Sequence, residues 1–571
     1  MNTEIFGVTL QVALTLLLAF PLGRYIAKVY KGERSCLDFM KPVERLIYRI
    51  AGADPEQDMN WKCFLKALLM SNLFWFAWGL LLLFLQNVLP LNPDGHEHMS
   101  FSLAFHTCAS FLANGNLQHY TGEQSLSYFT QLFVVMLFQF LTAATGMAAL
   151  AGVMTALAHK TTQSLGNYWR YLTLSVTRIL LPLSLVLGLL LITQGVPMSF
   201  DGQQTTKTLE GGVQQVSQGP VAAIVPIKQL GTNGGGFFGS NAAHPLENPT
   251  YLTQMAEGIS LLLIPMALAL SFGYFTRRRK LGYMIFGVML IAFLAGAAVN
   301  IGEEMKGNPA IHSLGIAQEN GNMEGKEVRF GSAATGLWSA ATTASSNGSA
   351  NGSLESLMPL SNLVAMLNMQ TNTWFGGVGV GWLNYFTFII IAVFISGLMV
   401  GRTPEFIGKK VEAREMKIAA LIAMLPPLLI LGGTAIACWG ISSHPEWVAA
   451  DTGGGTWTGN PGFHGLSEML YQYTSSASDN GSALAGLTGD TTWWNFSSGF
   501  LLLIGRFLPI SGQLALVGLL AQKAYTPENA GTLRTDTVTF GAMTFITICI
   551  VAALSFFPSL ILSAIAEQLT L

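Results

Sequence analysis

Residues 221–235 read VAAIVPIKQLGTNGG, a short and mostly apolar segment that ends in a polar loop around Asn233-Gly234. The same arrangement recurs with Asn-Gly at positions 114–115, 347–348 and 480–481. Each loop follows a short half-apolar segment and precedes an apolar segment of membrane length. Irregular backbone at membrane depth is tolerated only where protein buries it or where it lines a water-filled cavity. The pattern therefore predicts four re-entrant loops.

The composition is typical of a membrane protein. Apolar residues make up 51% of the chain, charged residues only 11%, and the mean hydropathy is +0.46. The sequence contains no long polar block that could fold by itself in water, so we expect a single transmembrane domain over residues 1–571. The five cysteines are scattered without a Cys-x-x-Cys pair and indicate packing residues rather than a disulfide framework or a thiolate metal site.

Ten apolar runs have roughly the length that crosses about 30 Å of hydrocarbon. Their approximate cores are residues 5–22, 67–88, 132–157, 172–192, 259–275, 284–299, 382–400, 418–439, 496–520 and 538–565. Four segments are too short to span and lead into the loops. These pore segments are residues 101–112, 221–230, 333–345 and 466–476.

The positions of the 29 Lys and Arg residues indicate the orientation, because positively charged loops stay in the cytoplasm. The connections that hold the four Asn-Gly loops carry few of them. These few are Lys207, Lys228, Lys306, Lys326 and Arg329. We therefore expect both termini and all four loops to face the outside.

The eight inner spans group into four units, each made of an outward helix, a pore segment with its loop, and a returning helix. The expected units are residues 62–158, 171–276, 282–401 and 416–522. One extra helix precedes them at residues 1–30, and another follows at residues 536–571. The expected fold is an all-α polytopic membrane protein with ten transmembrane helices and four such repeats around a pseudo-fourfold pore.

Four loops that meet on one axis predict a site for a dehydrated monovalent cation. Glycine permits the left-handed or alternating backbone that turns successive carbonyl oxygens toward one axis, and asparagine tolerates this backbone best among the other residues. The pore segments would aim the negative ends of their helix dipoles at the ion. We expect backbone carbonyls to replace the water shell of potassium. The candidate filter residues are Ala113, Asn114, Gly115, Asn116, Thr232, Asn233, Gly234, Gly235, Ser346, Asn347, Gly348, Ser349, Asp479, Asn480, Gly481 and Ser482.

Asn-Gly is also the commonest signal for an ordinary tight turn, and it occurs again at positions 320–321 and 351–352. A single match would therefore favour a turn. Four matches that follow pore segments on the expected outer side favour the filter interpretation.

Four longer stretches carry a family resemblance. They are KQLGTNGGGFF at 228–238, HPLENPT at 244–250, FGGVG at 375–379 and GRTPEFIGKK at 401–410. Over essentially its whole length, the chain resembles the potassium-binding subunits of bacterial Kdp potassium-transporting ATPases, which belong to the superfamily of potassium transporters. The resemblance implies that the four loops form the filter, that Gln118 lies close to the ion path, and that a break near residues 376–381 governs passage below the filter. The candidate residues for the ion path or gate are Gln118, Asn372, Gly376, Gly377, Gly379 and Arg506.

Some filter positions depart from the pattern of that family. The first loop, Ala113-Asn114-Gly115-Asn116, lacks the usual hydroxyl residues. Asn347 stands in place of a cysteine, Asp479 in place of an asparagine, and Asn372 in place of an acidic residue.

The chain contains neither an Asp-Lys-Thr-Gly phosphorylation motif nor a nucleotide-binding Gly-x-x-x-x-Gly-Lys-Ser/Thr loop. We therefore expect that it does not hydrolyse ATP and needs no organic cofactor. The resemblance implies three partners in the bacterial inner membrane: a P-type ATPase catalytic subunit, a third single-span subunit and a small accessory membrane peptide. No nucleic acid is expected, and both termini should be periplasmic.

The expected function is to select extracellular potassium and to deliver it to the ATPase subunit. Two alternatives remain open at this point. One is an autonomous potassium channel or cation symporter of the same superfamily, and the other is a structural membrane scaffold.

Overall fold

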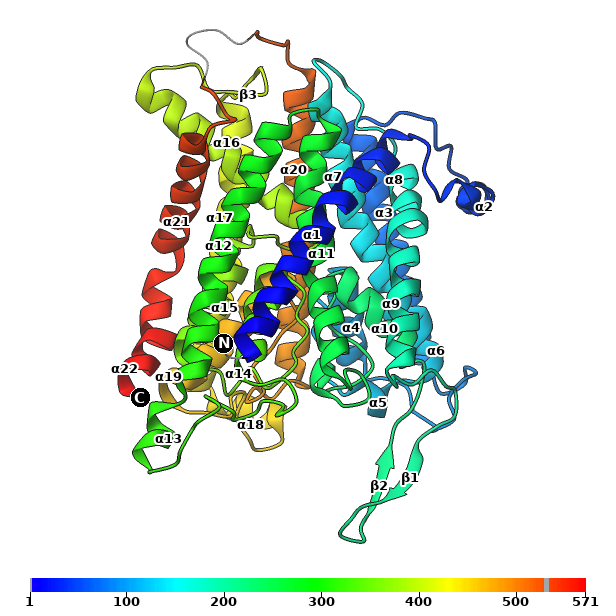
Figure 1. Cartoon of the computed structure of the whole chain (residues 1–571), viewed down its shortest axis with the longest axis vertical. Coiled ribbons are helices and arrows are strands. Elements are labelled where there is room, and N and C mark those ends of the chain that lie inside the picture. Colours follow the sequence, from blue (N-terminus) through cyan, green and yellow to red (C-terminus); the bar gives the residue numbers. More distant parts are fainter. Residues whose placement is uncertain (1–2, 528–532) are drawn as a thin grey trace.

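The computed structural model describes residues 3–527 and 533–571. Within these ranges, ten helical segments are long and apolar enough to cross a membrane, which confirms the predicted spans and the all-α class. They are Glu4–Lys31, Trp61–Leu85, Tyr128–Ala158, Tyr168–Thr193, Tyr251–Phe275, Arg279–Ser313, Val380–Met399, Ala413–Ser443, Thr492–Gln522 and Val538–Thr570. In Figure 1 the long helices stand side by side as one bundle, with α1 crossing it obliquely.

The α-helices are α1 (Thr3–Lys31), α2 (Lys41–Ala51), α3 (Trp61–Leu85), α4 (Phe101–Leu112), α5 (Gly122–Ser125), α6 (Tyr128–Thr130), α7 (Leu137–Ala158), α8 (Tyr168–Ser175), α9 (Leu181–Thr193), α10 (Val221–Leu230), α11 (Tyr251–Phe275), α12 (Arg279–Lys306), α13 (Pro309–Ser313), α14 (Ser332–Ala344), α15 (Pro359–Thr371), α16 (Val380–Val400), α17 (Ala413–Ser443), α18 (Pro445–Thr452), α19 (Gly462–Ala477), α20 (Thr492–Gln522), α21 (Val538–Leu560) and α22 (Ala566–Thr570). Short 3-10 or π-helical turns are η1 (Asp38–Met40), η2 (Gln131–Met136), η3 (Val176–Leu180), η4 (Asn241–Ala243) and η5 (Ile561–Ile565).

Polar side chains fix the starts of several helices. Asn60 accepts a hydrogen bond from the backbone N–H of Cys63 at the start of α3, and Ser100 accepts one from Leu103 at the start of α4. Such capping satisfies backbone donors that have no partner inside the helix. Glu412 and Glu415 form a reciprocal capping box at the start of α17. The helix ends are therefore set by the sequence as well as by the surrounding protein.

The order of long helix, short helix, loop and long helix occurs four times along the chain. The short helices are α4, α10, α14 and α19, and each lies between two spans. In the third unit the returning limb is divided into α15 and α16, and residues 372–379 separate them. The family resemblance implied a break near residues 376–381. It begins earlier because Asn372 takes a left-handed conformation, with φ 45°, that ends α15.

Two small hairpins lie at opposite ends of the bundle (Figure 1). Strand β1 (Gln204–Lys207) pairs antiparallel with β2 (Val213–Val216), and this hairpin projects away from the helices. Strand β3 (Glu405–Phe406) pairs antiparallel with β4 (Lys409–Lys410) near the opposite end. Both chain termini lie in the half of the molecule that carries the β1–β2 hairpin.

His464 links the extra C-terminal helix to the fourth unit through hydrogen bonds. In α19, its Nε2 lies 2.6 Å from Oε1 of Glu355, and its Nδ1 lies 2.6 Å from Oε1 of Glu567 in α22. These hydrogen bonds, first to Glu355 and then to Glu567, raise the pKa of His464 from 6.5 to about 10. The two carboxylates therefore hold the imidazole in its charged form at neutral pH.

We expect His464→Gln to lower the thermal unfolding temperature at neutral pH. The folded pKa is raised, so the stabilisation is complete below about pH 6.5 and is lost as the pH rises through about 10. The difference between parent and variant should therefore shrink over that window. Thermal unfolding of the purified protein in detergent at several pH values measures this, and a difference that grows with pH would contradict it.

Candidate ion-binding site

Each short helix ends at a loop with the same alternating backbone. The helices α4, α10, α14 and α19 contain 12, 10, 13 and 16 residues. A first left-handed residue follows the helix end, and a second comes two positions later. The first residues are Asn114 (φ 67°), Thr232 (48°), Ser346 (51°) and Asp479 (54°). The second residues are Asn116 (φ 51°), Gly234 (78°), Gly348 (91°) and Gly481 (92°).

This alternation gives a different register for the first loop from the one that the Asn-Gly pairs suggest. The backbone N–H groups of Gly115, Asn233, Asn347 and Asn480 donate to the carbonyls of Ser110, Lys228, Thr342 and Ser475, at 3.1, 2.9, 2.8 and 2.9 Å. Gly115 is therefore the counterpart of the three Asn residues, and Asn116 is the counterpart of the three Gly residues. Matching Asn114-Gly115 to the other Asn-Gly pairs, as the sequence suggested, is wrong by one residue.

The equivalent four-residue loops are consequently residues 113–116, 231–234, 345–348 and 478–481. Gly231, Ser345 and Ser478 belong to them and were missed by sequence reasoning. Gly235, Ser349 and Ser482 lie one position beyond. The number of residues between the helix end and each loop position identifies the equivalent residues. The sequence pattern does not place helix ends to within one residue.

The four loops meet in a closed ring. An ideal Cβ on Gly234 would lie within 3.0 Å of the carbonyl oxygen of Asn347 in the next loop. A Cβ on Gly348 would approach the carbonyl oxygen of Asn480 in the same way, and a Cβ on Gly481 that of Gly115. The remaining corner is made by Asn116, whose side-chain Nδ2 donates to the carbonyl oxygen of Asn233 at 2.6 Å. Each loop thus contacts the carbonyl of the next, and the last loop returns to the first.

Most polar side chains of the ring brace the loops. Thr232 Oγ1 accepts from the N–H of Val378 at 2.9 Å, and Ser346 Oγ donates to the carbonyl of Ser478 at 2.9 Å. Three amide oxygens are occupied in a similar way. Asn114 Oδ1 accepts from Thr142 Oγ1 (2.8 Å), Asn347 Oδ1 from the N–H of Ser349 (2.9 Å) and Asn480 Oδ1 from the N–H of Ser482 (3.0 Å). Backbone carbonyls are therefore the principal oxygens left to face an ion.

A vestibule of about 540 Å³ lies on one side of the ring, and residues from the first, third and fourth loops line it. Asn116, Gly348 and Gly481 are among them. Gln118 lines it too, while its amide is hydrogen-bonded to the backbone of Gly236, as donor at 3.0 Å and acceptor at 2.9 Å. Gln118 therefore holds the first and second loops together at the mouth.

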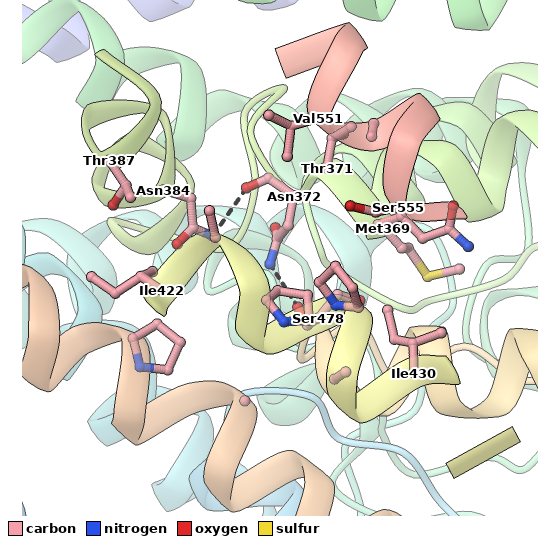
Figure 2. Close-up of a pocket in the computed structure, with 18 of the residues that line it drawn as sticks. Met369, Thr371, Asn372, Asn384, Thr387, Ile422, Ile430, Ser478, Val551 and Ser555 are labelled. Carbon is pink, nitrogen blue, oxygen red and sulfur yellow. Dashed lines mark hydrogen bonds between the residues drawn. The ribbon is translucent and has the colours of Figure 1, made fainter. Parts of the chain in front are cut away.

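A cavity of about 50 Å³ lies on the other side of the ring, and Ser478 and Asp479 of the fourth loop line it. Figure 2 shows Asn372 at its centre: Asn372 Nδ2 donates to the carbonyl of Ser478 at 3.0 Å, and Asn384 Nδ2 donates to the carbonyl of Asn372 at 3.1 Å. A volume of this size holds one or two waters or a bare ion but no organic molecule. The cavity connects the ring to the break in the third unit.

The residues of the break gather directly beneath the second and third loops. A Cβ on Gly377 would be 3.6 Å from Ser346 Cβ and 3.8 Å from Nη1 of Arg506. Arg506 is buried, and its Nη2 donates to the carbonyl of Thr142 at 3.3 Å. Gly379 has φ 84° and packs against the carbonyl of Gly146, while Gly376 packs against Asn372 and Gly381. The structure thus brings Asn372, Gly376, Gly377, Gly379 and Arg506 together.

We expect Gly379→Ala to destabilise the protein and Gly377→Ala to leave its thermal unfolding temperature unchanged. Alanine at 379 would be strained in a left-handed backbone by about 1–2 kcal/mol and would also collide with the carbonyl of Gly146. Gly377 has an ordinary φ, and its added methyl would make normal contacts. Thermal unfolding of both variants in detergent tests this, and equal effects would contradict it.

A family model and related sequences match nearly the whole chain. A family model described as "Potassium-transporting ATPase A subunit" (KdpA) matches residues 9–569. Proteins described as potassium-transporting ATPase potassium-binding subunits are similar over the full length. That of Phocaeicola vulgatus is 64% identical over 100% of both chains, and that of Alicyclobacillus acidocaldarius is 47% identical over 99% of both. The solved structure of the potassium transporter TrkH from Vibrio parahaemolyticus has a TM-score of 0.47 and 13% identity, over 90% of this chain and 98% of that one.

Proposed function

This chain belongs to the family of potassium-transporting ATPase A subunits, and from this premise we propose that its ring of four loops selects potassium for an ATP-driven uptake complex. Potassium is the transported ion, and it is bound by the loops 113–116, 231–234, 345–348 and 478–481. The chain passes the ion to a partner P-type ATPase subunit, which hydrolyses ATP.

The closed ring is the observation that supports this proposal. The four loops contact one another in turn, and each has the alternating backbone that can direct carbonyl oxygens toward a common centre. Carbonyl oxygens are neutral ligands that suit a dehydrated monovalent cation, whereas calcium sites in proteins are usually built with carboxylates. The C-terminal ends of α4, α10, α14 and α19 add negative potential of about half an elementary charge each at most.

The proposed setting is the bacterial inner membrane. Ten apolar spans support a multi-pass protein, and the distribution of Lys and Arg favours an outward-facing vestibule with both termini in the periplasm. The proposed partners are the catalytic ATPase subunit, a third single-span subunit and a small accessory peptide. The small cavity beneath the ring and the break at residues 372–379 would lie on the route toward the partner.

Two measurements test the proposal. The purified complex should hydrolyse ATP in response to potassium, with a half-saturating concentration that changes when ring residues are replaced. The chain reconstituted alone should conduct little potassium, because its passage is coupled to the partner. A robust passive potassium current through the isolated chain would instead support an autonomous channel or symporter.

A further inference from the structure

One corner of the ring differs from the other three. At the second left-handed position, three loops have glycine and the first has Asn116. Its side chain fills the place where the other corners bring backbone against backbone, and Nδ2 donates to the carbonyl oxygen of Asn233 at 2.6 Å. A carbonyl can only accept a hydrogen bond, so the amide nitrogen must face Asn233. Oδ1 of Asn116 therefore points away from that carbonyl.

Oδ1 of Asn116 has no hydrogen-bond partner within the described part of the chain. The residue is only 1% exposed, and leaving a buried acceptor unpaired is unfavourable. Asn114, Asn347 and Asn480 differ in this respect, since their amide oxygens are all occupied. Asn116 also lines the vestibule together with Gly348 and Gly481. An unpaired oxygen therefore remains at the vestibule end of the ring.

We propose that Oδ1 of Asn116 is a side-chain ligand for potassium at the vestibule end of the ring. This inference rests on the proposed function and adds a determinant of cation specificity to it. An amide oxygen is a neutral, hard ligand, so it can replace one water of a partly dehydrated alkali cation without binding divalent ions strongly. The other three corners offer only backbone at this level, so the entry site is asymmetric.

The same side chain also sets the position of a ring carbonyl. The bond from Nδ2 to Asn233 fixes that carbonyl, and Oδ1 is held in place by the planar amide group. Asn116 thus keeps the carbonyl oxygen of Asn233 and its own Oδ1 at a fixed distance from each other. We expect this distance to favour potassium over the smaller sodium ion.

Asn241 offers a matched control. It also lines the vestibule, has a left-handed backbone (φ 59°), and donates through Nδ2 to a ring carbonyl, that of Gly234, at 3.0 Å. Its Oδ1, in contrast, accepts from the N–H of Ala242 at 3.1 Å. Asn116→Gly and Asn241→Gly therefore both relieve a left-handed asparagine and both remove an amide donor. Only Asn116→Gly removes an unpaired oxygen.

The experiment titrates the ATPase activity of the purified complex with potassium, rubidium and sodium chlorides for the parent and both variants. For Asn116→Gly we expect the half-saturating potassium concentration to rise about tenfold, equivalent to about 1.4 kcal/mol, and discrimination against sodium to weaken. For Asn241→Gly we expect a change of less than about threefold with unaltered ion preference. Thermal unfolding temperatures in detergent should stay close to the parent value for both.

Equal shifts in the two variants, or an Asn116→Gly complex with unchanged potassium dependence and ion preference, would overturn the role of Asn116. A lowered unfolding temperature in Asn116→Gly alone, without a change in ion preference, would also overturn it, because it would indicate a structural role. The proposed function itself fails in a different way, namely if the parent complex does not respond to potassium at all.

Discussion

Replacing Gly481 by alanine is expected to raise the half-saturating potassium concentration of the complex by about 100-fold, which corresponds to about 2.7 kcal/mol. Gly481 has φ 92°, a conformation that strains an alanine by about 1–2 kcal/mol. Its Cβ would also press against the carbonyl oxygen of Gly115 in the first loop. The ring would have to open at the corner where its last loop meets its first. Potassium-dependent ATPase activity of the purified complex measures the effect.

Gly115→Ala is the informative control for that variant. The two glycines follow asparagine in the same sequence pattern, yet Gly115 is not left-handed in the structure. Its Cβ would meet first Cδ2 of Leu502, the flexible end of a side chain, at 2.6 Å. We expect its half-saturating concentration to change less than about fivefold. Equal losses at 115 and 481 would favour the register suggested by the Asn-Gly pairs over the register of the structure.

Replacement of the buried guanidinium of Arg506 is the second large effect that we expect. Arg506 is 2% exposed, and its Nη2 donates to the carbonyl of Thr142 at 3.3 Å. A hydrogen bond from a charged group contributes about 1.5–3 kcal/mol. Arg506→Gln should therefore lower the thermal unfolding temperature and the yield of folded complex. Asp479→Asn should change them little, because it keeps the shape of a buried side chain whose Oδ1 has no hydrogen-bond partner among the described residues.

The double variant Asp479→Asn/Arg506→Gln should lose about as much stability as Arg506→Gln alone. A double-mutant cycle on thermal unfolding is expected to give a coupling energy below about 0.5 kcal/mol. A coupling energy of about 1 kcal/mol or more would show instead that the two groups act as an ion pair. The same set of variants, assayed for potassium-dependent ATPase activity, shows whether the pair also affects the ion.

Apolar run length was enough to predict the spans and two of the pore segments. The predicted segments at residues 101–112 and 221–230 coincide with α4 and α10. The fourth was predicted from residue 466, whereas α19 begins at Gly462. Its first turn contains His464 and is held by ion pairs with residues far away in the sequence. A hydropathy pattern contains no information on such contacts, so it did not predict the start of α19.

Details of the ring depended on contacts that no local pattern contains. Asn114, Gly115 and Asn116 can all adopt left-handed backbone at modest cost, so the sequence left the register of the first loop undecided. The end of α4 at Leu112 and the bond from Asn116 to Asn233 decide it. The role of Gln118 is similar, because its partner Gly236 belongs to another unit.

The contact between Gly481 and Gly115 also has a consequence for biogenesis. The first loop leaves the ribosome long before the fourth, so a nascent chain that has inserted only three units has a gap at this corner. Its alternating loops then lack a neighbour on one side, and the proposed coordination shell for potassium is incomplete until the last unit is in the bilayer. Ambient potassium should therefore stabilise the finished polypeptide against proteolysis while offering nothing to shorter translation products.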